Sequence, residues 1–467
     1  MLFNSIQFAL FLPAVFLVYW LLRRKLHWQN AFVVAASYLF YGWWNWRFLL
    51  LIAFTSGCSF LSGLMMERPN LRKAALWSNA GANLLVLGVF KYYDFFASQL
   101  ALLLGLPPDR WLLGLVLPVG ISFYTFQALS YSIDVYRGTI RPTHDAVAFF
   151  AYVSFFPQLV AGPIERAQSL LPQFEHSRQF DPSAAADGMR QMLWGLFKKM
   201  VVADSCAVYV DQVFAQPDIY AGGTLAVAAV LFSIQIYGDF SGYSDVAIGC
   251  AKLFGIKLRL NFAVPYFARD IAEFWRRWHM SLTSWFRDYV YIPLGGSRTT
   301  RWKIIRNTLV VFLLSGLWHG ANWTFLAWGL YHALLFMPLI LTGRNRRYKD
   351  AVAVGKRLPS WQEATRMTFT FICVTLGWIV FRSPDVGFAV NYIGHLFGSG
   401  NWLKPHPIVP LSVLAMAAVE WHNRFHDHGL QQLPKSRAVR WCFYIVLIFT
   451  IVAFMPTDEM PFLYFQF

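Results

Sequence analysis

The chain has 467 residues, of which 57% are apolar and only 14% are charged, whereas a soluble domain carries about 25% charged residues. This composition excludes a soluble globular protein, whose surface needs more charge, and a disordered one, which has far less apolar area. The 40 Lys and Arg residues outnumber the 24 Asp and Glu residues, so the net charge is +16.

The basic residues fall in short clusters between apolar runs, and nucleic-acid binding would instead need them gathered on one face. The clusters cover residues 23–25, 68–73, 298–306, 344–356 and 435–440. This spacing is typical of the cytoplasmic loops of a membrane protein. We therefore expect a lipid membrane as the partner and no nucleic acid.

Several apolar runs approach the roughly twenty helical residues that cross a hydrocarbon core about 30 Å thick. They predict about eleven spanning helices, with the shorter runs re-entrant or amphipathic. No repeat or long linker divides the chain, so we expect residues 1–467 to form a single all-α integral membrane domain. The runs lie near 5–22, 30–45, 48–65, 75–96, 112–134, 146–163, 189–214, 223–250, 303–317, 321–342, 367–382, 406–421 and 439–456.

Polar residues stand inside two of the later runs. Lys198 and Lys199 interrupt an apolar stretch, and we expect that stretch to be amphipathic or partly embedded. Further along, Asp239, Ser241 and Asp245 are expected to line a cavity or to cap a broken helix, because bare polar groups are costly in lipid.

The segment 273–288 interleaves aromatic residues with charged ones and with His279. If it is helical, Arg276 and His279 lie on one face, three residues apart. One interpretation is an interfacial helix whose arginines meet anionic headgroups. The other is a cytoplasm-facing site for an anionic ligand such as a coenzyme phosphate. The residues alone leave both interpretations open.

A second polar motif, Ser-Gly-Leu-Trp-His-Gly-Ala-Asn at 315–322, joins two apolar runs whose far ends are both basic. The runs are therefore expected to form a hairpin that places His319 about 20 Å from the basic end. At that depth a histidine faces either a functional cavity or a neighbouring helix. Gly316 and Gly320 leave room beside it for an approaching backbone or for a substrate.

Neutral imidazole is a suitable base for a hydroxyl group near neutral pH. A hydroxyl that attacks a thioester needs such a base and a donor to the developing oxyanion. His279 and His319 are candidates to divide these two roles. His332 is interpreted as a core histidine. The histidine pair of the charged turn 420–428 has metal-like i,i+4 spacing, but we expect neither metal binding nor catalysis there. We expect no bound metal and no bound cofactor.

With other stretches, these motifs resemble the membrane-bound O-acyltransferase superfamily, in particular its bacterial branch of alginate and cellulose O-acetylation proteins. The stretches Glu-Phe-Trp-Arg-Arg-Trp-His at 273–279 and Gly-Leu-Trp-His-Gly-Ala-Asn at 316–322 are the most specific. The matching stretches follow in order through most of the chain, at 117–124, 133–138, 156–163, 239–249, 273–282, 287–296 and 316–323.

The resemblance implies a bundle of about eleven helices around a central funnel and tunnel. It implies that His319 is catalytic, as base for the acceptor hydroxyl or as stabiliser of the tetrahedral intermediate. His279 would then assist, or position the thioester, on the cytoplasmic side of the tunnel. Residues expected to bind the donor or to line the tunnel are Arg276, Arg277, Trp318, Asn322, Asp239 and Ser241.

The resemblance further implies a multi-pass O-acetyltransferase of the bacterial inner membrane with acetyl-CoA as its cytoplasmic donor. The acetyl group would pass to a periplasmic partner transferase of a polysaccharide synthesis and secretion complex that serves biofilm formation. The acceptor implied is an exopolysaccharide, cellulose or alginate, and the end of the chain at 462–467, without a polar tail, slightly favours cellulose.

Three alternatives stay open. In the first, the protein transfers D-alanine to teichoic acid. In the second, it transfers acetyl groups to peptidoglycan. A non-catalytic transporter is the third, although transporters often contain inverted repeats and this sequence shows none.

Overall fold

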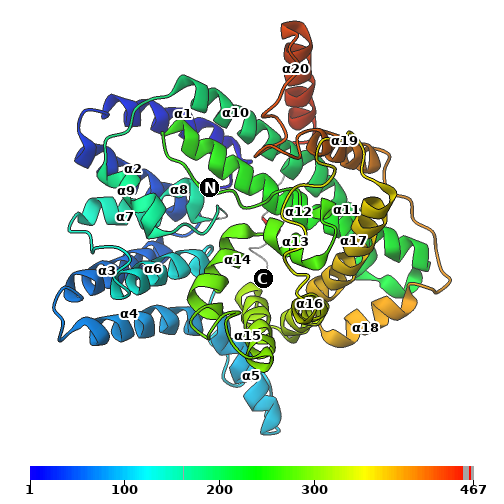
Figure 1. The fold of residues 1–467 in the computed structure, drawn as a ribbon, viewed down its shortest axis with the longest axis horizontal. Helices are drawn as coiled ribbons and strands as arrows, with labels where there is room; N and C mark the ends of the chain where they lie inside the picture. Colours follow the sequence, from blue (N-terminus) through cyan, green and yellow to red (C-terminus); the bar gives the residue numbers. More distant parts are fainter. Residues whose placement is uncertain (161, 456–461, 464–467) are drawn as a thin grey trace. The chain divides into compact units, whose positions relative to one another are not determined.

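The computed structural model describes residues 1–160, 162–455 and 462–463. Within these ranges the named elements are all helical (Figure 1), which confirms the all-α prediction there. Some sequence predictions touch residues outside them: the run 146–163 and the matching stretch 156–163 at residue 161, the run 439–456 at its last residue, and the end of the chain at 464–467.

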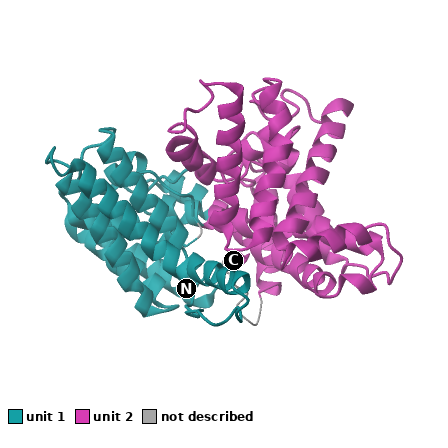
Figure 2. Ribbon diagram, turned by 90° about the horizontal axis from the view of Figure 1, so that it is seen from below, with its two compact units in different colours: residues 1–189, 247–259 teal, residues 190–246, 260–467 magenta. Residues whose placement is uncertain are grey.

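The chain divides into two compact units (Figure 2). The first comprises residues 1–189 and 247–259, and the second comprises residues 190–246 and 260–467. The boundary therefore passes within α10 (Pro182–Leu196) and within α12 (Gly222–Leu253). One integral domain over the whole chain stays a prediction.

Four helices in the described part of the chain are long and apolar enough to cross a membrane. They are the helix Trp46–Met65, α12, α16 (Trp323–Leu341) and α17 (Trp361–Arg382), and shorter apolar helices occur at α1 (Ile6–Leu21) and α19 (Ile408–His422). The predicted count of about eleven is not confirmed. Several apolar runs form shorter helices: the run 112–134, for example, becomes helical only from Ile121.

The first unit is held together by buried polar contacts between its helices. Its elements are α1, α2 (Leu26–Gly42), α3 (Leu49–Met65), α4 (Arg72–Leu87), α5 (Tyr93–Leu103), α6 (Ile121–Tyr136), α7 (Ala146–Ser154), α8 (Phe156–Leu159) and α9 (Ala167–Glu175). Helices α3, α4 and α6 lie side by side. Asn79 of α4 accepts from Ser59 of α3 at 3.1 Å and donates to Ser132 of α6 at 2.7 Å, so one amide joins all three.

The second unit contains the two histidine motifs. Besides most of α12, α16, α17 and α19, it includes η3 (Phe197–Ala203), α11 (Asp204–Ala215), α13 (Ile271–Arg277), α14 (Met280–Phe286), η6 (Arg287–Tyr291), α15 (Arg301–His319), α18 (Val386–His395) and α20 (Arg437–Ala453). Its core contains four fully buried tryptophans, Trp194, Trp278, Trp328 and Trp378.

Helices α15 and α16 form the predicted hairpin. Glycines let the two helices approach closely, because a Cβ at Gly316 would lie 2.2 Å from the carbonyl oxygen of Phe325, and one at Gly329 would lie 2.4 Å from that of Phe312. A Cβ at Gly320 would lie 2.1 Å from a carbon of the Phe325 ring, so this ring occupies the space beside the glycine. The sequence analysis left the space at Gly316 and Gly320 open to either a backbone or a substrate. In the structure, Phe325 occupies the space at both glycines.

Candidate active site

A break between α13 and α14 positions His279. Helix α13 begins at its N-cap, Asp270, whose carboxylate accepts from the Glu273 N–H at 2.7 Å, and it ends at Arg277. His279 then adopts a left-handed backbone conformation, with φ 44° and ψ 54°, which a side-chain-bearing residue holds only where its surroundings impose it. The prediction that Arg276 and His279 share one helix face is therefore wrong.

Asn261 supplies the surroundings that impose this conformation. Its backbone carbonyl accepts from Met280 N at 2.9 Å, and its side-chain Oδ1 accepts from the N–H and the hydroxyl of Ser281 at 3.3 and 2.9 Å. Its amide nitrogen donates to Ser244 of α12 at 3.2 Å. The buried amide thereby replaces the helical hydrogen bonds that are lost at the break.

The same amide determines the tautomer of His279. Nδ1 of His279 lies 3.1 Å from Oδ1 of Asn261. Because the Ser281 backbone N–H also points at this atom, Oδ1 is an acceptor, and Nδ1 must carry the proton. Nε2 then carries the lone pair. The residue is only 1% exposed, and burial lowers the pKa of His279 to about 3, so the ring is neutral at physiological pH.

His319 lies at the end of α15 and faces the same cavity as His279. One stripe of α15 lines this cavity at helical spacing, with Thr308, Ser315 and His319 among its members. The indole ring of Trp318 lies 5.6 Å from the ring of His279 and 5.0 Å from that of His319. The structure thus brings both predicted catalytic histidines to one chamber.

The cavity has a volume of about 230 Å³ and a mainly aromatic and aliphatic lining. Apolar walls of this kind strengthen polar interactions inside a cavity. Its lining residues are Trp275, Trp278, His279, Leu282, Thr283, Phe286, Arg287, Tyr291, Ser297, Thr308, Val311, Phe312, Ser315, His319, Phe336, Asn345 and Arg346.

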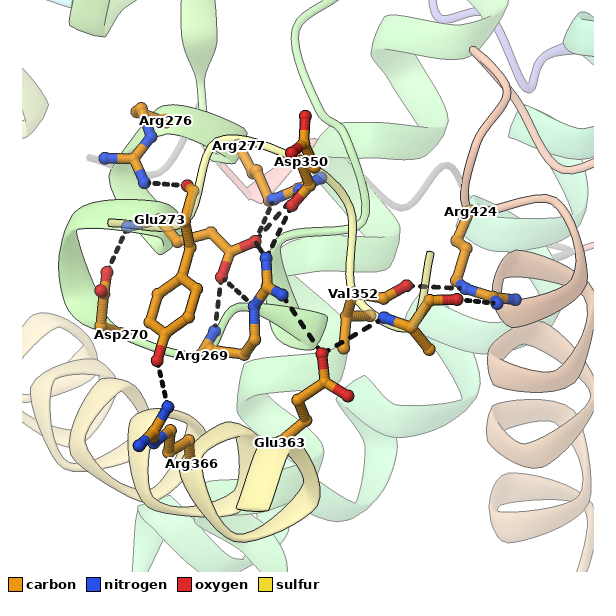
Figure 3. Close-up of polar contacts among 12 residues, drawn as sticks. Arg269, Asp270, Glu273, Arg276, Arg277, Asp350, Val352, Glu363, Arg366 and Arg424 are labelled. Carbon is orange, nitrogen blue, oxygen red and sulfur yellow. Dashed lines mark hydrogen bonds and ion pairs between the residues drawn. The ribbon is translucent and has the colours of Figure 1, made fainter. Parts of the chain in front are cut away.

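Arg276 and Arg277 are not among the residues that line this cavity, and both have partners in the chain (Figure 3). Arg276 donates to the backbone carbonyls of Asn345, at 2.6 Å, and Tyr348. Arg277 pairs with Glu273 at 3.1 Å and donates to the Asp350 carbonyl at 3.1 Å. Both guanidinium groups therefore hold the loop between α16 and α17, and their direct contact with a donor stays a prediction.

Asn322 caps the second helix of the hairpin. Its side chain accepts from Thr324 N at 3.0 Å at the start of α16 and donates to the carbonyl of Pro384 at 2.8 Å. These contacts fix the turn that follows His319. Asn322 does not line the histidine cavity.

Asp239 and Ser241 lie on α12, which is continuous over this region, so the expectation that they cap a broken helix is wrong. They bind the two lysines that interrupt the preceding apolar run. Lys199 lies 2.6 Å from Asp239, and Lys198 donates to Ser241 at 2.8 Å and pairs with Asp245 at 2.6 Å. The lysines are 3% and 4% exposed, on η3, so this stretch is embedded in the protein.

Two buried residues near the cavity were not predicted to matter. Asn261 has no signal in the sequence, since a single Asn in a short polar segment has no characteristic spacing. His332 was expected to be a satisfied core histidine. It is fully buried, with Trp275 and Trp328 rings at 5.0 Å, but its ring nitrogens have no hydrogen-bond partner within the described structure.

Among residues 1–160, 162–455 and 462–463, no three His, Cys, Asp or Glu side chains are grouped so that they could hold a metal ion. The polar groups that face the cavity are those of imidazole, hydroxyl, amide and guanidinium groups. Such a set suits proton transfer and hydrogen bonding to a substrate.

Comparisons with known proteins identify the family of the chain. The family model of the membrane-bound O-acyltransferase family matches residues 139–381, which include both histidines. The chain is 36% identical to a probable alginate O-acetylase of Azotobacter vinelandii over 94% of this chain and 88% of that protein. It is 38% identical to the Pseudomonas aeruginosa protein of the same name over 86% and 76% of the two chains.

A third relative has a different name. The chain is 33% identical to the peptidoglycan O-acetyltransferase of Helicobacter pylori, over 96% of this chain and 88% of that protein. The family match covers more than half of the chain, and the relatives cover most of it. The chain therefore belongs to the membrane-bound O-acyltransferase family and is an O-acyltransferase.

Proposed function

We propose that the protein is a multi-pass O-acetyltransferase of the bacterial inner membrane that serves the acetylation of a secreted exopolysaccharide. The relatives named alginate O-acetylases support acetyl as the cargo and favour alginate over cellulose as the acceptor. The observation that carries the proposal is the apolar cavity shared by His279 and His319, because it brings two imidazole groups to one mainly apolar chamber.

In the proposed reaction, the oxygen of an acceptor hydroxyl attacks the thioester carbon of acetyl-CoA. The C–O bond forms, the C–S bond breaks, and the hydroxyl proton ends on the departing sulfur. His319 takes this proton and then returns it to the thiolate. While His319 is protonated, its positive charge stabilises the oxyanion of the tetrahedral intermediate. Nε2 of His279 accepts a hydrogen bond from the acyl donor, acetyl-CoA, and so positions the thioester.

The other predicted site residues have supporting roles in this proposal. Trp318 packs against both imidazole rings and helps to hold them in place, although it is not among the residues that line the cavity. Asn322 fixes the turn beyond His319. Arg276 and Arg277 act on the donor through the loop that they hold.

In this proposal Asp239 and Ser241 act on the histidine cavity only indirectly, through other residues. Both belong to the buried lysine cluster, which supports α12. Ser244 of the same helix bonds Asn261, which in turn orients His279. The cluster therefore contributes to the tunnel wall through the helix that it anchors.

We place the acceptor on the outer side of the membrane. The hairpin of α15 and α16 has basic residues at its open end, and the turn after His319 lies at the opposite end. Since basic ends stay in the cytoplasm, His319 is reached from the outside and the thioester from the inside. In this proposal the acceptor hydroxyl belongs to a periplasmic partner transferase of the polysaccharide synthesis and secretion complex, which then passes the acetyl group to the polysaccharide.

The proposal is tested by His319→Ala in a strain that lacks the wild-type gene. Acetyl content of the secreted polymer is expected to fall to the level of the deletion strain, while polymer yield and the amount of membrane protein persist. His332→Gln is the matched control, since His332 is also buried in the second unit but does not line the cavity. Unchanged acetylation in His319→Ala would sink the proposal.

A second acceptor is favoured by one specific observation, the similarity to the peptidoglycan O-acetyltransferase of Helicobacter pylori. In that case the chemistry at His319 is the same and only the acceptor differs. Quantifying ester-linked acetate separately in the secreted polymer and in purified peptidoglycan of the deletion strain decides between the two. Loss of acetate from the peptidoglycan fraction alone would replace the exopolysaccharide assignment.

A further inference from the structure

The loop between α16 and α17 comprises residues 342–360. Its basic residues are numerous, and the histidine cavity does not account for most of them. The loop contains six basic residues and a single acidic one, Asp350. A loop of this length without secondary structure of its own is usually functional or disordered. Here it is ordered by the protein, because arginines from other elements bind its backbone (Figure 3).

Four arginines hold the loop through its carbonyl oxygens. Arg276 binds the carbonyls at 345 and 348, while Arg269 and Arg277 both bind that of Asp350, at 2.6 and 3.1 Å. Arg424 alone binds three carbonyls, at 352, 353 and 356, with distances of 3.1, 3.1 and 2.6 Å. Carbonyl oxygens are neutral, so these contacts order the loop without cancelling its positive charge.

One residue of the loop is strained. Ala353 has φ 53°, in the left-handed region that favours glycine, and it is 3% exposed. The contacts from Arg424 to its own carbonyl and to that of Val352 hold it there. A strained, buried position of this kind in a surface loop indicates that the shape of the loop is specified.

This loop forms one wall of a second cavity, of about 270 Å³. Three basic side chains of the loop line it, Arg347, Lys349 and Lys356, with Asp350 as the one carboxylate of the loop. Arg269 and Glu363 line it as well, but they pair with each other at 3.3 Å. The cavity therefore has a positive excess, which suits a doubly charged phosphate group.

The loop also connects the two cavities. Asn345 and Arg346 line the histidine cavity, and the next residue, Arg347, lines the basic one. A single ligand that extends along this loop would reach both. Acetyl-CoA has the required form, with a thioester at one end and a phosphorylated nucleotide at the other.

We propose that this basic cavity, formed by Arg347, Lys349 and Lys356, binds the phosphate groups of the donor's nucleotide. The inference rests on the proposed function, in which acetyl-CoA is the donor. Anionic lipid headgroups present the same phosphate chemistry, and the experiment below separates the two sources. In this arrangement the nucleotide is bound by a pre-ordered loop, and the thioester is left to the histidine cavity.

The test measures the affinity of the purified full-length protein for adenosine 3′,5′-bisphosphate, in phosphatidylcholine nanodiscs, by calorimetry. The double variant Lys349→Gln/Lys356→Gln is expected to bind it about tenfold more weakly, since two charged contacts are lost. Arg344→Gln/Arg357→Gln removes the same charge from the same loop outside the cavity and is expected to change the affinity by less than about twofold.

Two further arms complete the experiment. Adding phosphatidylglycerol to the nanodiscs is expected to leave nucleotide affinity unchanged. His319→Ala is expected to bind the nucleotide like wild type, so this result stands apart from the outcome of the acetylation test. Each single variant, Lys349→Gln or Lys356→Gln, is expected to lose about threefold, which keeps the test usable if the double variant unfolds.

Three results would overturn the inference. Equal weakening in both double variants would mean that general charge attracts the nucleotide. Unchanged affinity in Lys349→Gln/Lys356→Gln would mean that the cavity is not the binding site. Displacement of the nucleotide by phosphatidylglycerol would assign the cavity to lipid headgroups.

Discussion

Two regions of the second unit bury basic side chains in opposite ways. On η3 and α12, Lys198 and Lys199 lie against carboxylates, with Asp245 and Asp239 at 2.6 Å. Around the loop 342–360, Arg276 and Arg424 instead donate to neutral backbone carbonyls. The first region pairs its positive charge with carboxylates inside the protein, while in the second the basic side chains of the loop itself, Arg347, Lys349 and Lys356, line a cavity.

The difference indicates the function of each region. In the lysine cluster four carboxyl groups, of Asp204, Asp239, Asp245 and Glu420, surround two ammonium groups, while Tyr237 donates to Glu420 and Gln191 donates to Asp245. Such a closed set supports a helix and has little capacity for a ligand. The arginine-held loop has unpaired positive charge and a defined shape, which are the properties of an anion site.

The largest expected effect comes from breaking the lysine cluster. Lys198→Met leaves Asp245 and Glu420 buried without their cation, and we expect a loss of about 3–5 kcal/mol in the free energy of unfolding. The amount of folded protein and its thermal unfolding in detergent measure this. Lys252→Met is the control, because its pair with Asp187 is partly exposed and is expected to contribute less than about 1 kcal/mol. Equal stability of the two variants would contradict the distinction.

An intermediate effect is expected from freeing the loop. Arg424→Gln leaves the carbonyls of Val352 and Ala353 without their donor, at a local cost of about 1–3 kcal/mol. Hydrogen exchange of residues 345–356 is expected to accelerate, while the transmembrane helices stay protected. The matched variant Arg357→Gln, with an exposed guanidinium in the same loop, should exchange like wild type. Unchanged exchange in Arg424→Gln would show that the loop is ordered by other contacts.

The smallest effect is expected from Asn261→Asp, which places a carboxylate beside the neutral ring of His279. In wild type, the pKa of His279 near 3 keeps the ring neutral from pH 5 to 8. Asn261→Asp places a negative charge beside Nδ1 and raises this pKa, so the ring becomes protonated as the pH falls. Acetyl transfer by Asn261→Asp is expected to be near wild type at pH 8 and to fall as the pH is lowered toward the raised pKa of His279. A pH profile that coincides with wild type would exclude Asn261 as the residue that orients His279.

The sequence predicted part of this site and not the rest, for physical reasons. The hairpin followed from basic ends and apolar runs, and His319 from a polar residue at depth. The break at His279 was missed because helical spacing continues through it, and the cause is Asn261, eighteen residues earlier. Long-range partners of this kind leave no periodic pattern.

The same limit applies to the charged clusters. Lys198 and Asp239 each stand out in an apolar run, but pairing Lys199 with Asp239, and Lys198 with Asp245, requires the packing of η3 on α12. The polar composition of the loop 342–360 is typical of a connection between helices. Its order was not predictable, because it comes from arginines at 276 and 424 that bind carbonyls, and every residue type has a carbonyl.

The most direct test of the central claim follows labelled acetate from acetyl-CoA to the acceptor with purified full-length protein and its periplasmic partner. The wild-type protein is expected to transfer label, and His319→Ala to lose at least about a hundredfold of the rate while its binding of adenosine 3′,5′-bisphosphate is unchanged. Transfer by His319→Ala at the wild-type rate would contradict the assignment of the histidine cavity as the site of acyl transfer.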